Sequence, residues 1–207
     1  MGFKCGLVGM PNVGKSSIFN LLTSQKIDAK NFPFCTIDPN IATVEVPDDR
    51  LDKLSELNSS KNKINAVIEF VDIAGLIKGA SKGEGLGNKF LANIRETDAI
   101  LHVLRCFEDG NIIHVDGSVD PIRDKEIIDI ELQLKDLESV EKKIISLSRV
   151  IKSGDKDAVK ENDLATKLRE GLEQGLSVRA LDLTEEEQEL VHSFNLITAK
   201  PVMYVCN

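Results

Sequence analysis

The chain has 207 residues, 42% of them hydrophobic and 29% charged, which suits one well-packed domain with an insertion and excludes a disordered or fibrous protein. Its 26 basic and 34 acidic residues give a formal charge of -8, which argues against strong non-specific attraction to DNA or to anionic membranes. No apolar run approaches the roughly 18 residues that span a bilayer, and the four cysteines are widely spaced. We therefore expect a cytoplasmic protein with reduced thiols, no DNA partner and no membrane partner.

Short β-rich runs alternate with helical patterns along the chain. Helical spacing of apolar residues covers Ser16–Ser24 and Asn88–Arg95, and Thr184 with Glu187 forms a capping-box pattern ahead of a further helix. This alternation predicts an α/β fold with a mostly parallel sheet flanked by helices. The expected strands are Lys4–Val8, Ile41–Val46, Ala66–Val71, Ala99–Cys106 and Val202–Cys206.

The stretch from residue 126 to residue 175 departs from that alternation. Apolar residues recur there at steps of three, four or seven, and Ser153–Asp155 supplies a turn. This pattern predicts an antiparallel coiled-coil helical hairpin, inserted between residues 1–125 and 176–207 of the α/β domain. Two ordinary covering helices are the alternative. Between Lys142 and Arg169, eight basic residues outnumber four acidic ones, which weakly suggests a contact surface.

The strongest motif is Gly9-Met10-Pro11-Asn12-Val13-Gly14-Lys15-Ser16, which matches G-x-x-x-x-G-K-[ST] between a predicted strand and a predicted helix. In that context it predicts a phosphate-binding loop of a P-loop nucleoside triphosphatase. Gly9 and Gly14 let the backbone amides surround a β-phosphate, Lys15 bridges the β- and γ-oxygens, and Ser16 binds Mg²⁺. A glycine-rich helix start with a solvent lysine does not explain why these residue types occur together.

Three further residues complete the predicted metal and γ-phosphate site. Asp72 follows a buried strand and places a carboxylate in the outer shell of Mg²⁺, and Gly75 closes a D-x-x-G pattern whose amide senses the γ-phosphate. Thr36 lies in a loop-like segment between the two motifs and offers a second hydroxyl ligand to Mg²⁺. An ordinary turn threonine is the alternative interpretation of Thr36.

These motifs carry a family resemblance. Gly9–Ser16, Thr36 and Asp72–Gly75 resemble the first three nucleotide-binding motifs of the translation-factor class of GTPases, which have a G-domain-like fold. The glycine-rich run Gly75–Asn88 resembles the second switch of the Obg family. The chain is similar, in particular, to the YchF group, the Obg-like ATPases, on the residues Met1–Gly6, Asn31–Asn40 and Arg105–Glu108. That group also carries a helical insertion.

The resemblance implies a slow, Mg²⁺-dependent ATPase that accepts GTP less well and is associated with the ribosome or a translation complex. Tyr204–Asn207 resembles the approach to the base-recognition motif, and family members continue into a carboxyl-terminal module, so we expect this chain to be a fragment. From the residues alone, a GTP-specific GTPase of the same fold and a nucleotide-gated scaffold with negligible turnover both stay open.

Two residues bear on the choice of the catalytic group. Leu76 stands where many related hydrolases place a water-orienting glutamine, and the resemblance directs attention to His114 for that role, although a lone His beside isoleucines is more often structural. Asn12 is a hypothetical K⁺ contact, and His102 and His192 are expected to be structural. The predicted catalytic residues are His114 and Lys15, and the metal residues are Ser16, Thr36 and Asp72. The predicted nucleotide-binding residues are Gly9, Asn12, Val13, Gly14, Lys15, Ser16, Ser17, Gly75 and Asn207.

Overall fold

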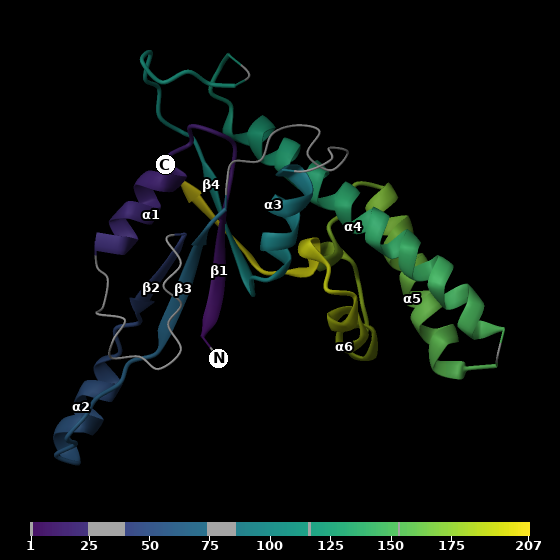
Figure 1. Cartoon of the computed structure of the whole chain (residues 1–207), viewed down its shortest axis with the longest axis horizontal. Helices are drawn as coiled ribbons and strands as arrows, with labels where there is room; N and C mark the ends of the chain where they lie inside the picture. Colours follow the sequence, from purple (N-terminus) through teal and green to yellow (C-terminus); the bar gives the residue numbers. More distant parts are fainter. Residues whose placement is uncertain (1, 25–39, 74–85, 116, 153) are drawn as a thin grey trace.

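The computed structural model describes residues 2–24, 40–73, 86–115, 117–152 and 154–207 (Figure 1). Within these residues, five strands form one sheet in the order β2-β3-β1-β4-β5. Their bounds agree with the predicted strands to within two residues at each end: β1 Phe3–Val8, β2 Ile41–Glu45, β3 Val67–Asp72, β4 Ala99–Leu104 and β5 Val202–Cys206.

The strand directions make the sheet mostly parallel, as the sequence predicted. β1 lies parallel to both β3 and β4, and β4 lies parallel to β5. Only β2 runs antiparallel, against β3, among the strands that the structure describes. The carboxyl ends of β1, β3 and β4 therefore meet at one edge of the sheet, where the loops that follow these strands can form a shared site.

Helices cover both faces of this sheet. On one face, Phe19 of α1 (Lys15–Ser24) packs against Leu7 and Leu101. On the other face, α3 (Leu86–Arg95) contributes Leu91 and Ile94 to the core that contains Val8 and Ile100. Figure 1 shows α1 on one side of the strands and α3 with the first part of α4 on the other. The short helix α2 (Asp49–Leu57) projects away from the sheet and buries none of its residues.

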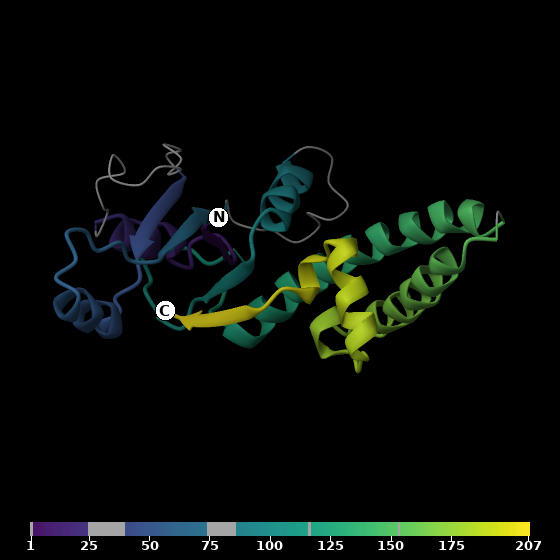
Figure 2. The ribbon, with the colours of Figure 1, turned by 90° about the horizontal axis from the view of Figure 1, so that it is seen from below.

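Two long helices follow the sheet's fourth strand. α4 runs over Pro121–Ile151 and α5 over Lys156–Glu173, and the two lie side by side in opposite directions, extending away from the sheet (Figures 1 and 2). Asp120 caps α4 by accepting the Arg123 amide, and Asp155 caps α5. The apolar residues between the two helices are Val140, Leu164, Ala165, Leu168 and Leu172, with Leu137 and Ile144 at the margin.

Side chains pack across both predicted domain boundaries. The boundaries and the coiled-coil geometry of the hairpin stay predictions. Residue 126 falls inside α4, whose Ile128 and Leu132 belong to the core beneath the sheet. After residue 175, Val178, Val191 and Leu196 belong to the core of the two long helices. The nucleotide-binding part and the hairpin therefore share α4 as a continuous element.

The last segment returns the chain to the sheet. Helix α6 (Glu185–Phe194) begins with the predicted capping box, because Thr184 Oγ1 accepts the Glu187 amide and Glu187 accepts the Thr184 amide at 2.8 Å. Two 3₁₀ turns, η2 (Val178–Ala180) and η3 (Ile197–Ala199), flank α6. None of the helices in the described part of the chain is both long and apolar enough to cross a bilayer.

Candidate nucleotide-binding site

The predicted phosphate loop, Gly9–Ser16, joins the end of β1 to the start of α1 at the carboxyl edge of the sheet. Two of its glycines meet steric demands. A Cβ at Gly9 would lie 2.5 Å from the Val103 carbonyl oxygen, and Gly14 has a φ of +96°. The loop therefore needs glycine at both positions to turn tightly against β4 and enter the helix.

Lys15 lies at the first turn of α1 with its side chain folded back over this loop. Its side chain is buried, and Nζ donates to the carbonyl oxygens of Gly9 at 3.0 Å and Met10 at 2.8 Å. Burial lowers the pKa of Lys15 to about 8, and the negative charge of Asp72 partly opposes that shift. The ammonium is thus held over the phosphate loop, partly desolvated, where an anion would meet it with little screening.

Asp72 ends β3 beside the phosphate loop. Burial raises the pKa of the Asp72 carboxyl, while the charge of Lys15 and a hydrogen bond to the Ser16 side chain lower it. The structure thus brings together Lys15, Ser16 and Asp72, three predicted site residues from two different elements. A hydroxyl and a carboxylate in contact are oxygen donors of the kind that Mg²⁺ prefers, so the donor set fits that ion.

The phosphate loop is also fixed from the far end of the chain. Asn207 Nδ2 donates to the Val13 carbonyl oxygen at 2.9 Å, and the backbone of Asn207 extends the β4–β5 ladder through Leu104 and Cys106. Val13 itself is a core residue, with 1% of its surface exposed, whereas Ser17 is exposed on α1. Val13 therefore contributes to the site through its backbone and anchors the loop through its side chain.

Asn12 connects the phosphate loop to the segment that carries His114. Asn12 has a left-handed backbone with a φ of +61°, and its Nδ2 donates to the Ile113 carbonyl oxygen at 3.1 Å. Asparagine tolerates that conformation better than most residues do. The position of the Ile113 carbonyl is therefore coupled directly to the shape of the phosphate loop.

His114 is buried and paired with an acid that sequence analysis did not single out. Its Nε2 lies 2.8 Å from Asp124 Oδ2, and both side chains are more than nine-tenths buried. Arg123 contacts the other oxygen of Asp124 at 3.0 Å. No local pattern marks Asp124 in the sequence, because its partner is ten residues away across an irregular loop. His102 is buried in β4, where burial lowers its pKa to about 4, in keeping with the structural role expected for it.

Several predicted residues lie outside the described part of the chain. These are Thr36, Gly75 and Leu76, together with most of the glycine-rich run that follows Asp72. The predicted roles of Thr36 and Gly75 stay predictions.

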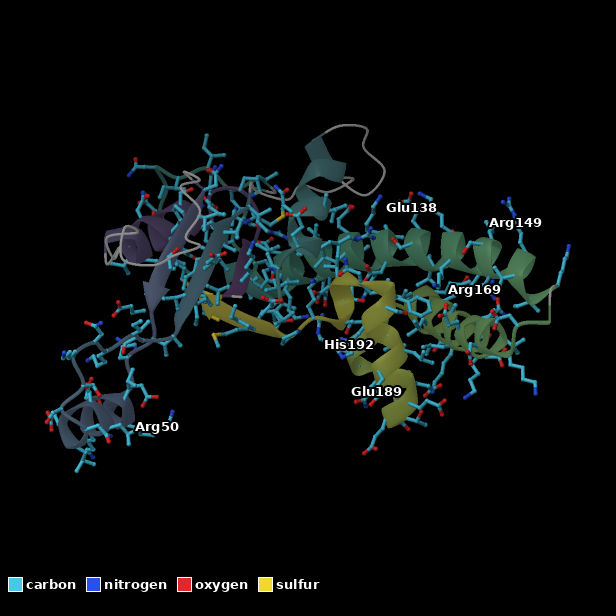
Figure 3. All side chains as sticks on the ribbon, turned by 60° about the horizontal axis from the view of Figure 1, so that its bottom comes forward. Arg50, Glu138, Arg149, Arg169, Glu189 and His192 are labelled. Carbon is cyan, nitrogen blue, oxygen red and sulfur yellow. The ribbon has the colours of Figure 1, made fainter. Side chains whose placement is uncertain are left out.

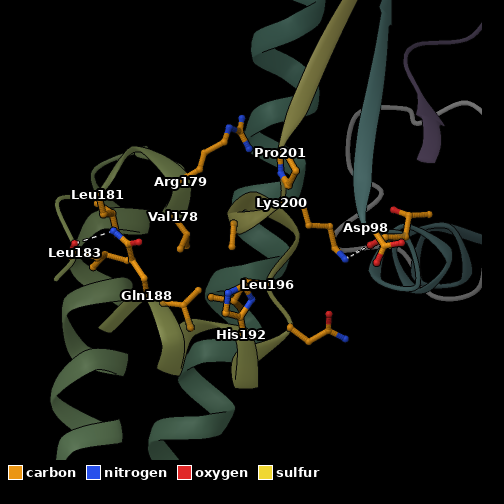
Figure 4. Close-up of a pocket in the computed structure, with 14 residues that line it drawn as sticks. Asp98, Val178, Arg179, Leu181, Leu183, Gln188, His192, Leu196, Lys200 and Pro201 are labelled. Atoms are coloured by element: carbon orange, nitrogen blue, oxygen red, sulfur yellow. Dashed lines mark hydrogen bonds between the residues drawn. The ribbon is translucent and has the colours of Figure 1, made fainter. Parts of the chain in front are cut away.

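A separate cavity of about 550 Å³ lies near the opposite edge of the sheet (Figure 4). It is lined by residues from α6, the two 3₁₀ turns and the starts of β4 and β5, including Asp98, His192 and Lys200. Lys200 Nζ donates to the Arg95 carbonyl oxygen at 2.9 Å. Because the parallel strands begin at this edge, the cavity is distinct from the site at their carboxyl ends.

Fold and site together define a P-loop nucleoside triphosphatase domain of the GTPase type: a mostly parallel sheet, a phosphate loop after β1 and a carboxylate at the end of β3. The sequence model of a family described as 50S ribosome-binding GTPase matches residues 4–148. The chain therefore belongs to that family.

Individual relatives extend this result to the whole chain. The ribosome-binding ATPase YchF of Bacillus subtilis (strain 168) is 54% identical over 207 residues, which are 100% of this chain and 57% of that protein. Obg-like ATPase 1 of Oryza sativa subsp. indica is 52% identical over 205 residues, which are 99% of this chain and 52% of that protein. The resemblance to the YchF group is thereby confirmed.

A solved structure supports the same assignment. The structure of the Schizosaccharomyces pombe YchF GTPase matches with a TM-score of 0.81 at 43% sequence identity, covering 100% of this chain and 56% of that chain. The chain thus spans little more than half the length of the relatives it matches.

Proposed function

We propose that this chain is the nucleotide-binding part of a Mg²⁺-dependent switch that hydrolyses ATP, and GTP less well, to the diphosphate and phosphate. The observation that carries this proposal is the buried Lys15 ammonium held over the phosphate loop by the Gly9 and Met10 carbonyls, beside Ser16 and Asp72. Two relatives that are named ATPases are 52% and 54% identical to this chain over 99% and 100% of its length.

Binding follows from the arrangement of the loop. The backbone amides of residues 12–16 and the amino end of α1 offer partial positive charge, and Lys15 adds a full charge in a partly desolvated position. Phosphate oxygens would replace the Gly9 and Met10 carbonyls as partners of Lys15. Ser16 would bind Mg²⁺ and Asp72 would hold the ion from its outer shell, and Mg²⁺ would neutralise charge on the phosphate oxygens.

His114 is the proposed group that positions the attacking water. To act there, its imidazole has to leave Asp124, to which it is bonded in this structure. The bond between Asn12 and the Ile113 carbonyl gives the phosphate loop a direct influence on the residue next to His114. We also propose that Asn12 helps to bind K⁺, which predicts faster turnover in potassium than in sodium; equal rates would contradict it.

Base preference is tested with the full-length protein, because this chain spans little more than half the length of its relatives. ATP and GTP are each titrated with Mg²⁺, and phosphate release is followed in the same samples. Tighter ATP binding with slow release supports the proposed ATPase. Tighter GTP binding favours a GTP-specific GTPase on the same site, and binding without release favours a nucleotide-gated scaffold.

We further propose that the hairpin contacts the ribosome, which would place the protein in the cytoplasm. Of the eight basic residues between Lys142 and Arg169, five form ion pairs with acidic neighbours. The other three lie at the hairpin's end, where Arg149 is labelled in Figure 3, and have no ion pair within the described residues: Arg149, Lys152 and Lys156. Such cations suit contacts with RNA phosphates.

The ribosome proposal is tested by co-sedimentation with ribosomal particles. Changing those three residues to glutamate should reduce binding and weaken its dependence on salt. The control makes the same charge change at Lys53, Lys61 and Lys63, which lie in and after α2 at the other end of the molecule (Figure 1), although Lys63 is ion-paired with Asp52. Equal binding by both variants and the wild type would contradict a hairpin contact.

A further inference from the structure

Arg105 is the first residue after β4 and is almost completely buried, with 1% of its surface exposed. No carboxylate forms an ion pair with it within the described residues, and its Nη1 has no hydrogen-bond acceptor there. A buried guanidinium without a counter-charge is costly for the fold. Its position therefore needs an explanation other than a salt bridge.

The guanidinium is surrounded by backbone carbonyls of the following loop. Nε donates to the Phe107 oxygen at 3.2 Å, and Nη2 donates to the Asp109 oxygen at 3.3 Å and the Ile112 oxygen at 3.0 Å. The Phe107 ring lies 4.5 Å from the guanidinium carbon. One planar side chain thus fixes three carbonyls and one ring of a single loop, a geometry that lysine cannot reproduce.

The segment of residues 107–114, which we call the His114 loop, has few other anchors. Most of its residues before His114 are exposed, and Ile113 is 80% exposed. A loop that buries so little apolar surface depends on hydrogen bonds for its shape. The contacts of Arg105 end at Ile112, and the next two residues are Ile113, which accepts the Asn12 amide, and His114, which pairs with Asp124.

We propose that Arg105 is a positioning residue for nucleotide hydrolysis: it holds the His114 loop in register so that His114 is correctly placed beside the phosphate loop. This inference rests on the proposed function, in which His114 positions the attacking water. Arg105 itself contacts no described residue of the phosphate loop through its side chain. Its effect should therefore fall on turnover rather than on nucleotide binding.

The test uses the full-length protein and the variants Arg105→Met and Arg105→Lys. Misplacing a reacting group by about 1 Å can cost about 100-fold in rate, so Arg105→Met should lower kcat by about 10- to 100-fold, with the dissociation constant for MgATP close to that of the wild type. Arg105→Lys keeps the positive charge but lacks the planar guanidinium, and it should lower kcat by an intermediate factor. Arg179→Lys is the matched control. Arg179 also donates to a backbone carbonyl, that of Thr198 at 3.1 Å, but it lies away from the His114 loop.

A double variant separates positioning from general destabilisation. If Arg105 acts through His114, then His114→Ala and the pair His114→Ala with Arg105→Met should turn over equally slowly. Additive losses, unchanged kcat in both Arg105 variants, or an equal loss in Arg179→Lys would each overturn the inference. If His114→Ala alone turns over like the wild type, the role of His114 in the proposed function fails, and the inference fails with it. If Arg105→Met does not fold, Arg105→Lys alone decides between these outcomes.

Discussion

Asn207 and Val13 are 194 positions apart in the sequence, and the side-chain amide of the first donates a 2.9 Å hydrogen bond to the carbonyl oxygen of the second. The backbone of Asn207 is itself fixed, because its N–H donates to Leu104 at 2.9 Å and its carbonyl accepts the Cys106 amide at 2.7 Å. The pairing of β4 with β5 therefore sets one side of the phosphate loop. A Cβ built at Gly14 would collide with the same Asn207 amide.

Gly14→Ala should be more harmful than its small size suggests. The added methyl group meets the Asn207 amide, and the φ of +96° is one that alanine rarely adopts. We expect a loss of stability above about 1 kcal/mol and weaker nucleotide binding, measured by urea unfolding and calorimetric titration.

Gly154→Ala is the control for that substitution. Gly154 has a φ of +85° and open space around its Cβ position, so it reports the backbone strain alone. Adding Asn207→Ala to Gly14→Ala should relieve the collision and recover part of the stability. If Gly14→Ala and Gly154→Ala lose the same stability, Asn207 does not restrict position 14.

Lys15→Ala should weaken nucleotide binding by about 1.5–3 kcal/mol, the usual contribution of a charge-assisted hydrogen bond to phosphate. The fold should persist, because without nucleotide the Lys15 ammonium donates, among the described residues, to the Gly9 and Met10 carbonyls alone. Calorimetric titration of MgATP measures the effect. Lys53→Ala, on exposed α2, serves as the control and should bind like the wild type; unchanged affinity in Lys15→Ala would remove the phosphate-loop assignment.

Nucleotide affinity should fall as the pH rises above about 8. Burial lowers the pKa of Lys15 to about 8 in the free protein, so the ammonium loses its proton in this range, whereas bound phosphate favours the protonated form. The affinity is therefore fully present below pH 8 and decreases by up to about tenfold per pH unit above it. Titrations between about pH 7.5 and 9.5 avoid the ionisation of the phosphate near pH 6. A Lys15→Ala variant should show no such dependence.

Local sequence patterns are sufficient to predict the strands, the phosphate loop and the carboxylate of this site. Continuous apolar runs marked the strands, and the G-x-x-x-x-G-K-[ST] pattern placed Lys15 and Ser16 at the start of a helix. Asp72 followed from the parallel sheet, because the carboxyl ends of neighbouring strands share an edge. Each of these features depends on residues that are close in sequence or on one rule of sheet geometry.

Features that depend on irregular loops could not be predicted in the same way. The start of α4 at Pro121 is not one of these features, because the Asp120 cap and the proline at the first helical position are both local signals. The pairing of His114 with Asp124 and the carbonyl contacts of Arg105 follow no periodicity. They arise from the path of one exposed loop, which hydrophobic patterning does not constrain.

Asp136 joins the long helix α4 to the segment that leads into β5, and its removal should destabilise the fold. Asp136 is completely buried, and its two oxygens accept the amides of Ile197 at 2.9 Å and Thr198 at 2.6 Å. Asp136→Ala leaves both donors without an acceptor, at a cost of about 1–3 kcal/mol for each. The loss is measured by urea unfolding against Asp163→Ala, an exposed position on α5, which should change stability by less than about 0.5 kcal/mol.

Because Thr198 precedes β5, Asp136→Ala should also weaken the contact of Asn207 with the phosphate loop and thus MgATP binding. A variant that unfolds like the wild type would show that these two hydrogen bonds do not stabilise the junction.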